Sequence, residues 1–165
     1  LRTDPQRGKS RHMELTARED IEAPQDRVFA LMSDFDRIER QAMRRGAEVT
    51  RTAPGPGAGM AWHTRFTFRG KPREADITLT EHAPPDRMVF ESRTGGLDAV
   101  LTLEVVALSP TRTRINVTSV LGARSLSARL FLQSLKLAKG GIDTRFRKRV
   151  GDLAAAMESR LRPGA

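Results

Sequence analysis

The histidines and carboxylates of this chain do not fall into the spacings of the standard catalytic or metal-binding motifs. The chain has no cysteine, so it offers neither a thiol nucleophile nor a thiolate metal ligand. Strand alternation places His63 on the outer face of a predicted strand and His82 beyond its paired region, so the two side chains are not expected to converge. We therefore predict no catalytic residue, no metal site and no cofactor.

The glycine-rich run from Gly55 to Gly59 is a second candidate for chemistry, as a phosphate-binding loop. It leads into a predicted strand instead of following one and opening a helix, and it lacks the lysine that such loops carry. We interpret it as a flexible loop at the mouth of a pocket.

Basic side chains are the third feature, because they give the chain a formal net charge of +9. Four of them, Arg145, Arg147, Lys148 and Arg149, flank apolar residues of a predicted helix and are expected to form a solvated helix face. Phe146 lies among them in the sequence but belongs to the apolar stripe, so no aromatic residue shares their surface and we predict no nucleic-acid binding. Transient contact with an anionic membrane surface and binding of an acidic protein partner both stay open.

The elements that position these residues begin with an alternating strand from Met13 to Glu22. Pro24 fits the first turn of a helix, and apolar residues from Val28 onward repeat at helical spacing. Ser33 and Asp34 are expected to cap a second short helix over residues 35–41.

Six alternating strands follow, and their turns predict the register of three hairpins. A two-residue turn at Gly70-Lys71 predicts that Trp62 pairs with Leu79, Thr64 with Ile77 and Phe66 with Ala75. A turn at Gly95-Gly96 predicts that Phe90 faces Leu101 and Arg93 faces Asp98. A loop of odd length around Pro110 lets Leu103 face Val117 and Val105 face Ile115.

A single long helix is predicted from Ser125 onward. Its apolar stripe has a helical period, and Gly140-Gly141 is the expected position of a kink. The stripe runs through Leu126, Leu130, Leu137, Ile142, Phe146, Val150, Leu153, Met157 and Leu161. Such a stripe must pack on the inner face of the sheet, which is the only apolar surface of sufficient size.

Three features together indicate a family: the strand that ends Ile21-Glu22-Ala23-Pro24, the residues Val28, Leu31 and Asp34 at helical spacing, and the long C-terminal helix. In these features the chain resembles the helix-grip superfamily of Bet v 1, START and polyketide-cyclase-like domains, also called SRPBCC. The resemblance implies an α+β helix-grip fold. A curved seven-stranded antiparallel sheet would wrap around a long C-terminal helix, with two short helices between the first two strands. We expect one such domain over residues 13–165, preceded by a disordered basic arm or leader over residues 1–12.

Inward aromatic and aliphatic residues are core by default, and the resemblance makes them the wall of a cavity between the sheet and the helix. Inward hydroxyls would then bind a carbonyl or hydroxyl of a ligand, a neighbouring carbonyl, or water. The predicted cavity-lining residues are Trp62, Thr64, Phe66, Phe68, Ile77, Leu79, Phe90, Ser92, Leu101, Val117, Ser119, Phe131 and Leu135.

The favoured hypothesis is a binding protein or carrier of a small hydrophobic molecule that is lipid-, polyketide- or quinone-like. The alternatives are a polyketide cyclase or dehydratase type of enzyme, in which shape and a few polar groups orient a reactive chain, and a protein-interaction module of the chaperone-activator type. No apolar run reaches the length of a membrane span, so we expect a cytoplasmic protein without stable membrane insertion. Whether it forms a homodimer stays open.

Overall fold

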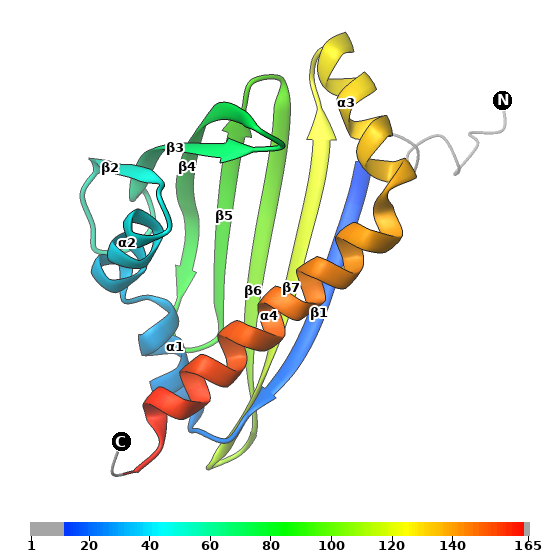
Figure 1. Ribbon diagram of the computed structural model, residues 1–165. Coiled ribbons are helices and arrows are strands. Elements are labelled where there is room, and N and C mark those ends of the chain that lie inside the picture. The colour runs from blue at the N-terminus through cyan, green and yellow to red at the C-terminus, as the bar shows by residue number, and fades with distance from the viewer. Residues whose placement is uncertain (1–11, 164–165) are drawn as a thin grey trace, which may run out of the picture.

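A curved antiparallel sheet with a long diagonal helix on its concave side forms the body of the protein (Figure 1). The computed structural model describes residues 12–163. The elements are β1 His12–Ile21, α1 Gln25–Met32, α2 Phe35–Arg44, β2 Glu48–Ala53, β3 Ala61–Phe68, β4 Lys71–Ala83, β5 Arg87–Thr94, β6 Leu97–Ser109, β7 Arg112–Ala123, α3 Leu126–Leu137 and α4 Lys139–Leu161. The sheet has seven strands in the order β1-β7-β6-β5-β4-β3-β2, which confirms the predicted α+β helix-grip architecture. The predicted arm lies outside the described residues except for His12, which begins β1.

The two short helices form where the sequence predicts them. Pro24 is the N-cap of α1 in an extended conformation, and the helix buries Val28, Phe29 and Met32. Asp34 caps α2, since its side chain accepts a hydrogen bond from the backbone N–H of Arg37. The second helix continues to Arg44, three residues beyond its predicted end at 41.

The β3–β4 hairpin turns one residue earlier than predicted, at Arg69-Gly70. Both residues have positive φ, 53° and 73°, as a primed hairpin turn requires. Consequently Trp62 pairs with Ile77 and Thr64 pairs with Ala75, and the predicted partners were wrong by two residues. A shift of two residues keeps every side chain on its face, so the inner and outer sets were still correct.

The other two hairpins have the predicted register. Phe90 faces Leu101 and Arg93 faces Asp98 across the turn at Gly95-Gly96. Leu103 faces Val117 in the last hairpin, where an irregularity between Ala107 and Ser109 absorbs the odd residue of the loop.

The C-terminal helix is broken at Ala138, two residues before the predicted kink. Its first segment, α3, packs on the sheet with a different face from the one that was predicted. Leu126, Leu130 and Leu137 are 72%, 64% and 93% exposed, so their predicted place in the buried stripe was wrong. Leu153 is also exposed. The residues of α3 that pack inward are Ala128, Leu132 and Leu135, which repeat at i, i+4 and i+7. Because the chain changes direction at Ala138, one continuous stripe does not describe both helices.

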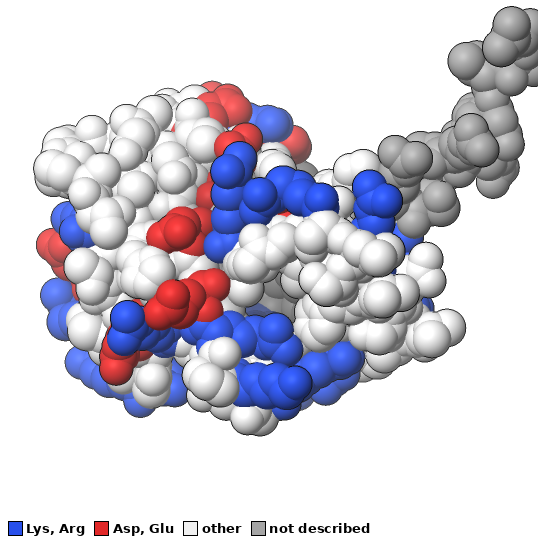
Figure 2. Space-filling model, turned by 90° about the horizontal axis from the view of Figure 1, so that it is seen from above, with Lys and Arg blue, Asp and Glu red and all other residues white. Residues whose placement is uncertain are grey.

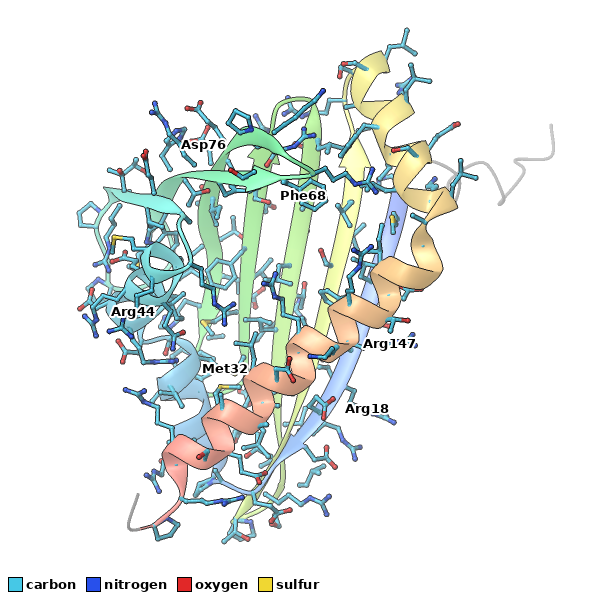
Figure 3. All side chains as sticks on the ribbon, in the orientation of Figure 1. Arg18, Met32, Arg44, Phe68, Asp76 and Arg147 are labelled. Atoms are coloured by element: carbon cyan, nitrogen blue, oxygen red, sulfur yellow. The ribbon has the colours of Figure 1, made fainter. Side chains whose placement is uncertain are left out.

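The α1 end of the concave face is tightly packed. Leu79, Met88, Val105 and Ile115 point inward from four neighbouring strands and are at most 2% exposed. They share a core cluster with residues of α1 and α4, among them Met32, which Figure 3 shows near the crossing of these helices. This end of the sheet therefore leaves no room between the layers.

Candidate functional site

The α3 end of the same concave face is more open. This is unexpected, because the residues there come from the central strands of the sheet. Along β5, Met88 is fully buried whereas Phe90 and Ser92 are half-buried. Along β6, Val105 is buried whereas Leu101 is half-buried. The diagonal path of α4 explains the gradient, because the helix lies over β5 and β6 only toward the α1 end (Figure 1). We call this open region the α3-end hollow.

Seven predicted cavity residues lie in this more open region of the inner face. They come from β3, β4, β5, β6 and β7, and all are half-buried on the inner face. They are Thr64, Phe66, Ile77, Phe90, Ser92, Leu101 and Ser119. Figure 2 looks onto this end and shows a depression bordered by the largely uncharged surface of α3 and by basic and acidic side chains elsewhere.

An aromatic group forms the wall of the hollow on the side of α2. The Trp62 ring lies 5.3 Å from that of Phe35 and 6.3 Å from that of Phe90, centroid to centroid. Trp62 is itself 6% exposed, so it is core that supports the wall. Its indole Nε1–H donates to Oε1 of Glu39 at 2.7 Å, which ties α2 to β3.

Glu39 is a residue that the sequence analysis missed. The same carboxylate oxygen accepts from Nε of Arg51 at 2.8 Å, while Nη2 of Arg51 donates to Asp36 at 2.7 Å. The hydrogen bond to Glu39 raises the pKa of Arg51. The signal in the sequence is an inward tryptophan, whose buried N–H needs an acceptor.

Hydroxyl groups supply the polar part of the hollow. Thr64 Oγ1 lies 3.4 Å from the carbonyl of Ala75, which is a weak hydrogen bond. Within residues 12–163 the hydroxyls of Ser92 and Ser119 have no hydrogen-bond partner. Two hydroxyls on an otherwise apolar surface are therefore free to bind a ligand or water.

The rim between the β3–β4 hairpin and α3 is built from two phenylalanines and two arginines. Phe68 is 42% exposed and lies at the hairpin tip (Figure 3), and Phe131 is half-buried on α3. The guanidinium carbon of Arg73 lies 4.9 Å from the Phe131 ring centroid and 5.8 Å from that of Phe68. Arg69 lies 5.7 Å from each ring. These cation–π contacts connect the hairpin to the helix.

Three other predicted cavity residues are buried. Leu79 has no exposed surface, Val117 is 7% exposed and Leu135 is 6% exposed. Leu135 packs with Met13 and Leu15 of β1. Their periodicity is the same as that of the hollow residues, so sequence patterns could not separate the two groups.

Two open grooves on the surface each include one of the predicted cavity-lining residues. One lies along β1 and β7 beside Arg147 of α4 and includes Val117. The other lies at the edge of the hairpin and includes Phe66 and Arg73, which pair across β3 and β4. The second groove therefore reaches the rim of the α3-end hollow.

His63 and His82 do not converge, as predicted, but their surroundings differ from the prediction. His63 faces Asp76, because the β3–β4 register differs from the predicted one by two residues, and its Nδ1 lies 2.7 Å from Oδ1 of Asp76, which raises the pKa of His63. His82 lies within the paired part of β4, where an irregularity between Leu79 and Glu81 turns it toward Phe29. Its buried Nε2 has no hydrogen-bond partner among the described residues, and no group of three possible metal ligands occurs in residues 12–163.

A helix-grip domain with an open, largely apolar concave end is the class of protein that this fold and site define. The chain belongs to the family described as polyketide cyclase / dehydrase and lipid transport, whose model matches residues 12–158. No curated protein matches the chain significantly.

Solved structures share the fold at low sequence identity. The Zhui aromatase/cyclase from Streptomyces sp. R1128 is 13% identical, with a TM-score of 0.68 over 93% of this chain and 98% of that one. Truncated norcoclaurine synthase from Thalictrum flavum is 13% identical, with a TM-score of 0.69 over 93% and 96%. A protein from Thermus thermophilus is 19% identical, with a TM-score of 0.65 over 90% and 99%. At such identities the similarity establishes the fold alone.

Across the described part of the chain, no helix has the length and hydropathy that crossing a bilayer requires.

Proposed function

We propose that this protein binds or carries a small hydrophobic molecule, lipid-, polyketide- or quinone-like, in the α3-end hollow. The observation that carries the proposal is the partial exposure of Phe90, Leu101 and Ile77 on central strands whose inward residues at the α1 end are buried. Burying such apolar surface under a ligand is favourable by about 25 cal/mol per Å² before ordering costs. The free hydroxyls of Ser92 and Ser119 would orient a polar group of the ligand.

A cyclase or dehydratase type of reaction is the second candidate, because the family description includes these activities and an aromatase/cyclase shares the fold. Such a reaction needs a proton donor or acceptor beside the substrate. Glu39, the carboxylate nearest the aromatic wall, is already hydrogen-bonded to Trp62 and Arg51. This arrangement suits a structural anchor better than a catalytic base, so the geometry favours binding.

Filling the hollow with a large side chain tests the proposal. Ser92→Trp places an indole on the inner face, whereas Val100→Trp adds the same group to the exposed outer face of β6 and serves as the matched control. We expect Ser92→Trp to weaken binding of the neutral dye Nile red at least tenfold, with no change for Val100→Trp. Wild-type affinity in a Ser92→Trp protein with a native circular dichroism spectrum would refute the hollow as the binding site.

We also propose a surface through which such a carrier would contact a membrane that holds its ligand. The outward leucines Leu126, Leu130 and Leu137 lie on α3, which contains basic but no acidic residues and borders the hollow. An apolar face with a positive surround is complementary to an anionic bilayer surface. We infer that α3 contacts such a surface transiently.

Vesicle sedimentation tests this contact. The double substitution Leu130→Glu with Leu137→Glu should reduce binding to phosphatidylglycerol-containing vesicles at least fivefold, while Leu153→Glu on α4 should leave it unchanged. Equal binding of the double variant would contradict a membrane role for α3. A wild-type dimer that the double variant disrupts, without vesicle binding, would instead identify a homodimer interface.

A further inference from the structure

The two arginines at the rim have no acidic partner. Within the described residues, neither Arg69 nor Arg73 forms a salt bridge, and the single hydrogen bond of their side chains runs from Nε of Arg73 to the carbonyl of Phe68 at 3.4 Å. Neighbouring arginines differ in this respect. Arg51 binds Asp36 and Glu39, and Arg65 binds Glu74 at 2.8 Å. The positive charge at the rim is therefore not neutralised by the protein.

Arg69 and Arg73 place this positive charge at the rim of the α3-end hollow, where one end of a bound ligand would lie. Arg73 points inward from β4, opposite Phe66, and is half-buried. Its contact with Phe131 of α3 spans the space between the hairpin and the helix. A molecule lying on Phe90 and Leu101 and extending toward α3 would meet these guanidinium groups.

The cation–π contacts with the phenylalanine rings leave the guanidinium groups ready to bind an anion. A guanidinium has five N–H donors, and among the described residues only Nε of Arg73 donates, to the carbonyl of Phe68. The rings also restrict the side-chain rotamers, so less conformational entropy is lost when an anion binds. Carboxylates and phosphates fit the fork of arginine with two parallel, charge-assisted hydrogen bonds.

We propose that the ligand is an anionic amphiphile, with its apolar body in the α3-end hollow and its carboxylate or phosphate group on Arg69 and Arg73. The inference rests on the proposed function and narrows its ligand class. A neutral ligand would leave the unpaired charges at the rim unused. Because Arg69 is exposed, we expect the charge contribution to be moderate and to weaken with salt.

Three probes with the same tail separate the head-group contribution from the hydrophobic one: dodecanoic acid, dodecyl phosphate and 1-dodecanol. Each probe is titrated against the Nile red complex of the protein, and the dissociation constants from displacement are compared. We expect the acid or the phosphate to bind about tenfold more tightly than the alcohol at low salt. The tighter of the two then identifies whether a carboxylate or a phosphate is the better head group.

Substitutions assign this preference to the rim. Arg69→Gln with Arg73→Gln should reduce the alcohol-to-anion ratio of dissociation constants from about ten to about one. Arg93→Gln, at an exposed outer-face arginine near the same end of the sheet, should keep the ratio. Raising the salt concentration should lower the ratio for the unmodified protein, which gives a second test that does not depend on the folding of a variant.

The outcomes are distinguishable. Equal binding of the acid, the phosphate and the alcohol by the wild type would overturn this inference and leave the hydrophobic site in place. A ratio that persists in the double variant would overturn the assignment to Arg69 and Arg73. Failure of all three probes and of Nile red to bind the folded protein would overturn the proposed function and this inference with it.

Discussion

Removing the carboxylate of Glu39 should loosen α2 from the sheet. In Glu39→Ala, the Trp62 indole N–H loses its acceptor at 2.7 Å while the ring stays 6% exposed. Leaving a buried donor unsatisfied costs about 1–3 kcal/mol. Arg51 keeps Asp36, so the broken ion pair adds little. We therefore expect the free energy of unfolding to fall by about 2 kcal/mol, with Glu39→Gln losing about half as much because its amide oxygen still accepts.

Urea denaturation measures this change, and Trp62 is the only tryptophan of the chain, so its fluorescence reports directly on the affected contact. Glu48→Ala is the matched control. Its carboxylate lies 4.0 Å from Arg65, and both side chains are more than 60% exposed. That variant should unfold within about 0.5 kcal/mol of the wild type. If Glu39→Ala were equally stable and its fluorescence spectrum unshifted, the indole–carboxylate bond would not hold the aromatic wall.

Three further changes test the packed end of the sheet, the start of α3 and the outer face. Leu79→Ala should lower the free energy of unfolding in urea by about 2–5 kcal/mol, since Leu79 has no exposed surface, and a loss below about 1 kcal/mol would contradict tight packing there. A Cβ on Gly96 would collide with Ser125, the N-cap of α3, so Gly96→Ala should cost about 1 kcal/mol and speed hydrogen exchange in the first turn of α3, whereas unchanged exchange would refute the contact. The hydrogen bond to Asp76 raises the pKa of His63 above 6.5, so this pair stabilises the fold fully below that pH and the contribution is lost as the pH rises through the raised value. Asp76→Asn should return the pKa of His63 toward 6.5 in an NMR titration, and an unchanged pKa would show that the hydrogen bond does not form.

Local periodicity was sufficient for the order of elements and for the faces of the strands. Alternation from Trp62 to Phe68 separated inner from outer side chains even though the turn was placed one residue too late, because a two-residue shift in pairing preserves the faces. The helix cap at Asp34 and the hairpin at Gly95-Gly96 depend on neighbouring residues alone and were predicted correctly.

Contacts between distant segments were not predictable in this way. Glu39 accepts from Trp62 across 23 positions, and Arg73 meets Phe131 only because the hairpin tip reaches α3. Nothing in the spacing of these residues indicates that they are neighbours. The break at Ala138, which turns Leu126 and Leu130 outward, likewise depends on how α3 packs against β7.

The sequence by itself determined a helix-grip domain with an apolar inner face, because amphipathic periodicity and turn residues are local properties. Only the tertiary structure decided which inward residues are core and which form a hollow. Leu79 and Ile77 are two residues apart on the same face of β4, yet one is fully buried and the other half-buried. The difference arises from the helices that pack on one end of the sheet, where Leu79 shares a core cluster with residues of α1 and α4, while the other end stays more open.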